Sequence, residues 1–166
     1  MKRILLSYND PLGYNKNHTP AIFFIIAKVF KGNRKNMIFI LEDNEDRIHY
    51  FKQALGDSEY HIERTVPEAI QWLQDHKAEV TRYSLDNDLT VFGYEGDEGE
   101  GWQLCEWLIA NTPPKPILCH STNYPASVKM EMMCQEAGWS FTRLIPVDGF
   151  EWIDRYWKRE INADLQ

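Results

Sequence analysis

The sequence predicts an α/β fold in which five parallel strands form a sheet with helices on both faces. Five short segments typical of strands, the first of them a continuous apolar run, alternate with segments whose apolar residues recur at helical spacing, and turn or capping residues separate these segments. Crossovers between parallel strands are right-handed and place helices on both faces of the sheet. We expect the strand order 2-1-3-4-5, which makes the first, third and fourth strands neighbours.

The first two strand and helix pairs have the clearest boundaries. Residues 37–41 are apolar throughout and end before two acids, as expected of a buried parallel strand. In the next segment apolar residues recur at helical spacing from Ile48, and Gly56 terminates the predicted helix. A second strand at about 60–64 precedes the capping box Thr65-Val-Pro-Glu68, which predicts the start of a second helix.

Three further pairs complete the predicted sheet. The strands are predicted at residues 81–85, 116–119 and 140–144, and the helices at 102–111, 125–137 and from about 150 onward. The glycine-rich acidic stretch Thr90–Gly101 is either a solvated loop or a mobile lid over a site at the same edge of the sheet. If Trp152 or Trp157 is exposed on the last helix, it marks a surface for a protein partner or a second copy of the chain.

Charge divides the chain at about residue 36. Residues 1–36 carry seven Lys and Arg and one Asp, whereas residues 37–166 carry 11 Lys and Arg and 24 Asp and Glu. The acidic part is predicted to be one domain, and it lacks the basic charge of a nucleic-acid-binding domain. Residues 1–36 show no regular periodicity and are predicted to be an extension. Either Met37 is the physiological start, or the segment is a small accessory piece that packs on the domain or on a membrane surface.

Cysteine usage and hydropathy predict a cytoplasmic protein. Cys105, Cys119 and Cys134 are odd in number and too widely spaced for a disulfide framework or a zinc knuckle, so we expect free thiols in a reducing compartment. The longest apolar run, within residues 21–30, is interrupted by Lys28 and is shorter than the ~20 residues that span a bilayer. We therefore expect no membrane span.

Acidic and polar side chains stand where three of the predicted strands end. Glu42 and Asp43 follow the first strand, Asp86 and Asp88 follow the third, and His120-Ser121-Thr122-Asn123 follows the fourth. The functional site of such a sheet lies beyond the carboxyl ends of its strands. Carboxylates that converge there need a cation to stay ionised, and their hard oxygens suit Mg²⁺ or Mn²⁺. The alternative is that an acid merely caps the helix that follows it.

Residues 37–146 resemble a response-regulator receiver domain of the CheY-like superfamily. The Glu42-Asp43 pair is similar to the acidic pair that holds Mg²⁺ in that family, and Asp86 resembles its phospho-accepting Asp. Ser121 stands at the position of the Ser or Thr that contacts the phosphoryl group. Ile145 replaces the family's Lys, which pairs with the acidic site, so the resemblance does not imply ordinary phosphotransfer switching.

Three motifs are more similar to a narrower group, the cyclic-phosphate-processing receiver-like family. They are Asp86-Asn87-Asp88-Leu89, Gly101-x-x-Leu104-x-x-Trp107-Leu108 after a glycine-containing insertion, and His120-Ser121-x-Asn123-x-Pro125. Members of that family keep the acidic pocket, lack the Lys and usually stand alone as one small domain. The resemblance implies a metal-dependent phosphoesterase that acts on cyclic-phosphate ends of RNA or on nucleotides.

That chemistry gives each candidate residue an expected role. Glu42, Asp43 and Asp86 are the expected ligands of Mg²⁺ or Mn²⁺, which would stabilise charge on the phosphate in the transition state. His120 is the expected general acid or base, and Asp88 is a further ligand or a base. The expected phosphate-binding side chains are Ser121, Thr122 and Asn123.

Two alternatives to an enzyme remain open at this point. The first is a degenerate receiver without the Lys that acts as a non-catalytic signalling or protein-interaction module through its last helix. The second is a true phosphoacceptor, which requires another cation in place of the Lys. Arg143 is near Ile145 in sequence, but strand alternation does not favour it for that role.

Overall fold

Five parallel strands form the sheet of the computed structural model, which describes residues 36–147 and 149–163. Their order is β2-β1-β3-β4-β5, and every neighbouring pair is parallel. The strands are β1 (Met37–Leu41), β2 (Tyr60–Glu63), β3 (Val80–Leu85), β4 (Ile117–Cys119) and β5 (Phe141–Arg143). The predicted fold class and strand order are therefore confirmed.

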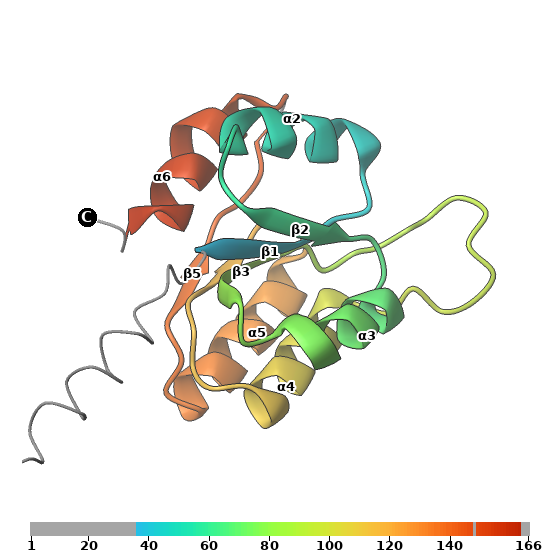
Figure 1. Ribbon diagram of the computed structural model, residues 1–166, viewed down its shortest axis with the longest axis vertical. Coiled ribbons are helices and arrows are strands. Elements are labelled where there is room, and N and C mark those ends of the chain that lie inside the picture. The colour runs from blue at the N-terminus through green and yellow to red at the C-terminus, as the bar shows by residue number, and fades with distance from the viewer. Residues whose placement is uncertain (1–35, 148, 164–166) are drawn as a thin grey trace, which may run out of the picture. The chain divides into compact units, whose positions relative to one another are not determined.

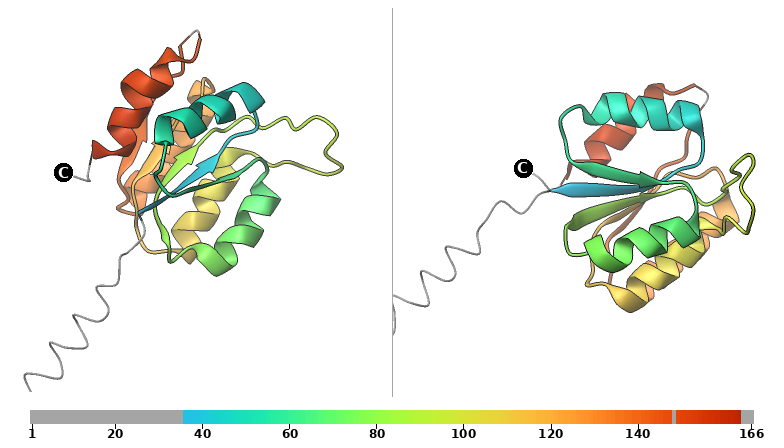
Figure 2. Two further views of the ribbon diagram at one scale, coloured as in Figure 1. Left: turned by 45° about the horizontal axis from the view of Figure 1, so that its top comes forward. Right: turned by 45° about the vertical axis from the view of Figure 1, so that its right-hand side comes forward.

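Helices cover both faces of this sheet, as Figures 1 and 2 show. The helices are α2 (Glu45–Leu55), α3 (Val66–His76), α4 (Gly101–Asn111), α5 (Tyr124–Glu136), the π-helical turn η1 (Ile153–Trp157) and α6 (Lys158–Ile161). One face carries α2, η1 and α6, and the other carries α3, α4 and α5. This arrangement follows from the right-handed crossovers between parallel strands.

Side-chain caps fix the starts of three helices close to the carboxyl edge of the sheet. The Asn44 side chain accepts a hydrogen bond from the Arg47 backbone N–H at 2.9 Å, and Thr65 accepts one from the Glu68 N–H at 3.3 Å. Asn123 caps α5 through the Ala126 N–H at 3.1 Å. Each cap satisfies a backbone donor that the first helical turn leaves unpaired. Asn44, and not the neighbouring acid, is thus the cap after β1.

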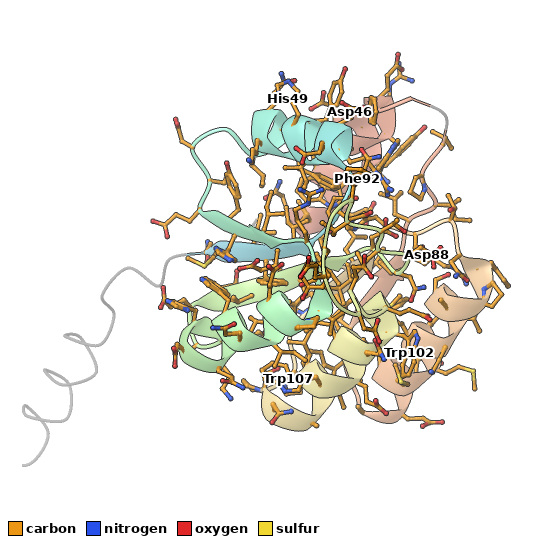
Figure 3. All side chains as sticks on the ribbon, turned by 90° about the vertical axis from the view of Figure 1, so that its right-hand side faces the viewer. Asp46, His49, Asp88, Phe92, Trp102 and Trp107 are labelled. Atoms are coloured by element: carbon orange, nitrogen blue, oxygen red, sulfur yellow. The ribbon has the colours of Figure 1, made fainter. Side chains whose placement is uncertain are left out.

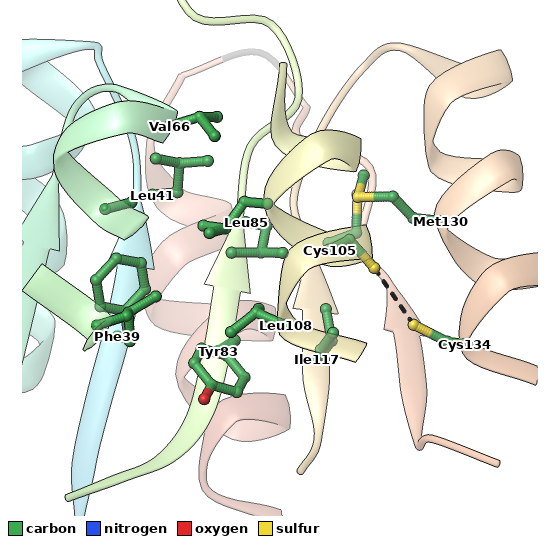
Figure 4. Close-up of a cluster of buried hydrophobic side chains, with 14 of the residues drawn as sticks. Phe39, Leu41, Val66, Tyr83, Leu85, Cys105, Leu108, Ile117, Met130 and Cys134 are labelled. Atoms are coloured by element: carbon green, nitrogen blue, oxygen red, sulfur yellow. Dashed lines mark hydrogen bonds between the residues drawn. The ribbon is translucent and has the colours of Figure 1, made fainter. Parts of the chain in front are cut away.

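Alternating side chains of the strands fill two hydrophobic clusters, one on each face. Phe39 and Leu41 point toward α3, α4 and α5, whereas Ile38 and Ile40 point toward α2 and η1. Because helices cover both faces of the sheet, β1 is apolar along its whole length. Figure 4 shows the larger cluster, in which the Cys105 and Cys134 thiols lie 3.6 Å apart. All three cysteines are free and buried.

The last helical segment buries both of its tryptophans. The side chains of Trp152 and Trp157 have 1% and 0% of their surface exposed, so neither of them marks an exposed surface for a partner. The reason is packing and hydrogen bonding. The Trp157 ring centroid lies 4.6 Å from that of Phe51, and its indole N–H donates to the Ser84 hydroxyl at 2.7 Å. Tyr156 is the exposed aromatic residue of η1.

Two predictions concern segments beyond the sheet. The extension predicted over residues 1–36 lies, apart from Asn36, outside the described residues, so its status stays a prediction. Within the residues that the structure describes, no helix is long and apolar enough to cross a membrane.

Buried ionisable groups of the core predict that stability falls in alkali. Burial raises the pKa of the Cys119 thiol from 9.0 to about 12 and that of the Tyr83 hydroxyl from 10.0 to about 12. Well below pH 9 both groups are protonated in the folded and unfolded chains. From about pH 9 for Cys119 and from about pH 10 for Tyr83, up to about pH 12, the group ionises mainly in the unfolded chain, so each lowers the free energy of unfolding by up to about 1.4 kcal/mol per pH unit.

Urea unfolding at about pH 8 and about pH 10.5 measures this effect. We expect a lower free energy of unfolding at the higher pH, and a smaller difference for Cys119→Ala. Equal or greater stability at the higher pH would contradict the prediction.

Candidate metal and phosphate site

Three carboxylates meet at the carboxyl edge of the sheet. Glu42 and Asp43 follow β1, Asp86 follows β3, and the three residues offer ligand oxygens that all lie within 4.8 Å of one another. Strand pairing produces this proximity. Leu41 pairs with Leu85, and the Asp86 backbone N–H donates to the Leu41 carbonyl oxygen at 3.0 Å. The structure therefore brings together the three residues that were predicted as metal ligands.

Glu42 is the most enclosed of these acids, with 0% of its surface exposed. Its Oε1 accepts a hydrogen bond from the Asn44 N–H at 2.9 Å, and its Oε2 lies 3.3 Å from both His120 Nε2 and Arg47 Nη1. Burial raises the pKa of Glu42 above its usual 4.5, while the contact with His120 opposes that rise. Glu42 thus depends on neighbouring donors to carry a negative charge.

One carboxylate oxygen of Asp43 is buried and accepts no hydrogen bond from the described residues. Its Oδ2 accepts a hydrogen bond from the Thr90 N–H at 2.8 Å, whereas its Oδ1 is buried without a hydrogen-bond partner among the described residues. Buried oxygens without a partner are costly, because they lose their contact with water. A hard divalent cation would satisfy this atom, so the donor set fits Mg²⁺ or Mn²⁺.

Arg47 is a site residue that the sequence analysis missed. It lies in α2, and its Nη1 contacts Asp86 Oδ2 at 2.8 Å as well as Glu42. Ile145, which the sequence resemblance placed at the position of the receiver Lys, is 56% exposed. Arg143 pairs with Glu131 at 3.7 Å, which agrees with the view that it does not replace the Lys. One feature of the sequence could have indicated that Arg47 belongs to the site: it lies in the first turn of the helix that follows Glu42 and Asp43.

His120 lies behind Glu42 in a buried hydrogen-bonded chain and has no exposed surface. Because its Nε2 faces a carboxylate, that nitrogen carries the proton, and Nδ1 then accepts a hydrogen bond from the Ser84 hydroxyl at 2.9 Å. Ser84 in turn accepts the indole N–H of Trp157. The predicted general acid or base therefore faces a metal-ligand candidate and is held in one tautomer by β3 and η1.

Of the remaining predicted site residues, two are exposed and the other two form hydrogen bonds that hold the local backbone. Asp88 is exposed, and its Oδ1 accepts hydrogen bonds from the side-chain amides of Asn87 and Asn123, both at 2.8 Å. Asn123 also caps α5. Ser121 is buried, and its hydroxyl accepts the Asn123 backbone N–H at 3.1 Å. Thr122 is exposed and faces the cavity described next.

A cavity of about 450 Å³ opens beside the acids. Its lining is partly polar and partly apolar. The polar lining consists of Arg47, Asp86, Asp88 and Thr122. The remaining lining consists of Pro146, Val147, Gly149, Phe150 and Trp152. Cavities of a few hundred Å³ with a few convergent polar groups are typical of small-molecule sites.

The loop over residues 90–101 borders the site without lining the cavity. Figure 3 shows Phe92 on this loop and Asp88 near its base. The loop returns through a bridge between Asp88 and Glu100, and the Val66 N–H donates to the Glu98 carbonyl oxygen at 2.7 Å. Phe92 is fully exposed. These contacts favour the solvated loop over the lid.

Gly101 joins this loop to the acidic site. A Cβ atom at Gly101 would lie 1.9 Å from the carbonyl oxygen of Asp86 and 2.9 Å from the Cα of Asn87. The Gly101 N–H donates to the Asn87 carbonyl oxygen at 2.9 Å. Only glycine allows α4 to begin this close to the backbone that carries Asp86.

Comparison with known proteins places the chain in a family. The profile of the cyclic-phosphate processing receiver domain matches residues 37–136, and the chain belongs to this family. No curated protein matches the chain.

Solved structures with the same fold are response-regulator receiver domains. The Mn²⁺-bound form of response regulator Rcp1 is 17% identical, with a TM-score of 0.57 over 78% of this chain and 94% of that one. The non-phosphorylated HemR receiver domain from Leptospira biflexa is 20% identical, with a TM-score of 0.56 over 76% and 94%. A CheY-like receiver domain protein from Methanospirillum hungatei JF-1 is 17% identical, with a TM-score of 0.54 over 77% and 94%. These similarities show that the chain has the receiver fold.

Gly101→Ala tests the link between the loop and the acids. The added methyl group has to displace the backbone of Asp86, so we expect a loss of about 1–3 kcal/mol in the free energy of unfolding. We also expect about tenfold weaker Mn²⁺ binding, because one ligand candidate moves. Urea unfolding and titration followed by tryptophan fluorescence measure the two effects.

Gly96→Ala is the matched control. The nearest atom to its Cβ position is in the ring of Tyr94, at 3.1 Å, which can rotate away. Equal effects of the two substitutions on Mn²⁺ affinity would show that the position of Gly101 is unimportant for the site.

Proposed function

We propose that this cyclic-phosphate processing receiver domain is a metal-dependent phosphoesterase that opens cyclic phosphates on nucleotides or RNA ends. One observation carries the proposal: the buried, unpartnered Oδ1 of Asp43 lies in a cluster with Glu42 and Asp86. Mg²⁺ or Mn²⁺ bound by these three residues would supply a Lewis acid for the phosphate oxygens. The Mn²⁺-bound form of Rcp1, which has the same fold, supports this choice of metal.

The reaction requires one bond to form and one to break. The oxygen of water attacks phosphorus and loses its proton to a base, the bond from phosphorus to one ribose oxygen breaks, and that oxygen takes up a proton from solvent water. Asp88 is the proposed base. It is exposed at the cavity, and both amide donors contact its Oδ1, which leaves Oδ2 to accept a proton from water. Asp86 faces the same cavity.

The buried His120 is proposed to act through Glu42. Its Nε2–H faces Glu42 Oε2 at 3.3 Å, and this contact favours the ionised carboxylate that a metal requires. Thr122 is the proposed phosphate-binding hydroxyl, because it lines the cavity. Ser121 and Asn123 are proposed to support it, since their polar groups hold the turn that carries Thr122.

The cavity has room for more than a phosphate group. Its volume of about 450 Å³ and its apolar wall suit a ribose and a base next to the carboxylates. Pro146, Val147 and Phe150 supply that wall. We therefore propose that the substrate is a 2′,3′-cyclic nucleotide or an RNA that ends in one.

The test is hydrolysis by the full chain with Mg²⁺ or Mn²⁺ and a panel of 2′,3′-cyclic nucleotides and cyclic-ended oligonucleotides. We expect phosphomonoesters to be released only when the metal is present. Chromatography measures their amount over time. Asp43→Asn and Asp86→Asn are expected to lower the rate by about 100-fold or more, because each removes a charged metal ligand. Asp75→Asn, on the exposed side of α3, is expected to leave the rate unchanged.

Two results would contradict an esterase. The first is an absence of turnover over the whole panel. The second is a stable acyl phosphate on Asp86 after treatment with a small phosphodonor. That second result favours the receiver acting as a signalling module, for which the contact of Arg47 with Asp86 supplies the cation.

A further inference from the structure

We propose that Arg47 is the anion-binding residue of this site and that it exchanges partners. In one arrangement its guanidinium pairs with Glu42 and Asp86. In the other it binds phosphate oxygens in the cavity while a divalent cation takes over the two carboxylates. This inference rests on the proposed metal-dependent function, and it assigns the part of the site that recognises the negative charge of the ligand.

The ion pairs of Arg47 use oxygens that a metal would also use. Its Nη1 lies 2.8 Å from Asp86 Oδ2 and 3.3 Å from Glu42 Oε2. Both acids belong to the cluster of carboxylates within 4.8 Å of one another. A guanidinium and a divalent cation repel each other, and the Asp86 oxygen cannot serve both at full strength. The two cations are therefore expected to compete.

Arg47 is also placed to meet an anion. Its side chain is 24% exposed and lines the cavity. Both of its carboxylate contacts use the same nitrogen, Nη1, whereas a guanidinium carries five N–H donors in a planar fork. That fork matches two oxygens of a phosphate, which is the geometry that makes arginine a preferred phosphate ligand.

Arg47 is the one cation among the described residues that line this cavity. Ile145 occupies the position of the receiver Lys, as noted above. Arg143 pairs with Glu131, and Arg64 donates to Glu45 and to the carbonyl oxygen of Asp43. A phosphate that enters between Asp86 and Asp88 would be repelled by both, so it needs a positive partner beside the metal.

The exchange couples the two ligands. A divalent cation that displaces Arg47 from the carboxylates prepares it for phosphate, so each ligand raises the affinity of the other by the same factor. Without the cation, Arg47 remains with the acids and the cavity binds anions poorly. Arg47 would thereby keep the site closed to phosphate until the metal is present.

Arg47→Gln separates the two parts of the proposal. We expect Mn²⁺ to bind about tenfold more tightly to this variant, because a charged competitor for the carboxylates is gone. We also expect inorganic phosphate, added at saturating Mn²⁺, to bind about tenfold more weakly, because the charged donors are lost. Trp152, which lines the cavity, is the fluorescent reporter, and calorimetry gives an independent affinity.

Two further variants complete the set. Arg47→Lys keeps the charge, and its affinities for Mn²⁺ and for phosphate are expected to lie between those of the wild type and Arg47→Gln. It replaces Arg47→Gln in the test if that variant fails to fold. Arg159→Gln is the matched control, because Arg159 is exposed and pairs with Glu160 in α6, away from the cavity lining. It is expected to bind both ligands as the wild type does.

Unchanged or weaker Mn²⁺ binding in Arg47→Gln would overturn the competition. Unchanged phosphate affinity would overturn the role of Arg47 in anion binding. Neither measurement depends on turnover, so either part can fail while hydrolysis persists. If wild type and variants all fail to bind Mn²⁺, both the exchange and the metal-dependent function are overturned. Metal and phosphate binding without hydrolysis would instead overturn the esterase alone.

Discussion

The parallel pairing of β1 with β3 is the constraint on which the rest of the site depends. The register that sets Leu41 opposite Leu85 places Glu42 and Asp86 at the same height on neighbouring strands. The hydrogen bond from the Asp86 N–H to the Leu41 carbonyl oxygen continues this pairing to Asp86 itself. A slip by one residue between β1 and β3 would move the side chains of one strand to the opposite face of the sheet and would offset Glu42 from Asp86.

This convergence of negative charge has to be balanced within the fold. Two of the three carboxylates are almost completely buried, and burial raises the pKa of Glu42. Three kinds of donor oppose this effect: the backbone N–H of Asn44, the ring of His120 and the guanidinium of Arg47. The acidic site is thus a network with partners from β1, β4 and α2, and each partner constrains the side chain that it contacts.

The fold and the position of the acids were predictable because both follow from local patterns. The first strand is an apolar run, the first and third strands end before acids, and caps such as Thr65 define helix starts. Arg47 was not predictable in this way, because its role depends on how α2 lies over the ends of the strands. The partners of the buried Trp152 and Trp157 were not predictable either, because Phe51 and Ser84 are far away in sequence.

The charged residues and the apolar lining of the cavity come from different stretches of the chain. The family match ends at residue 136, whereas the apolar lining of the cavity comes from Pro146, Val147, Gly149, Phe150 and Trp152. Substitutions after β5 can therefore change the apolar lining of the cavity while the residues of the acidic cluster stay the same. The width of the cavity and the charge beside it are encoded separately in the chain.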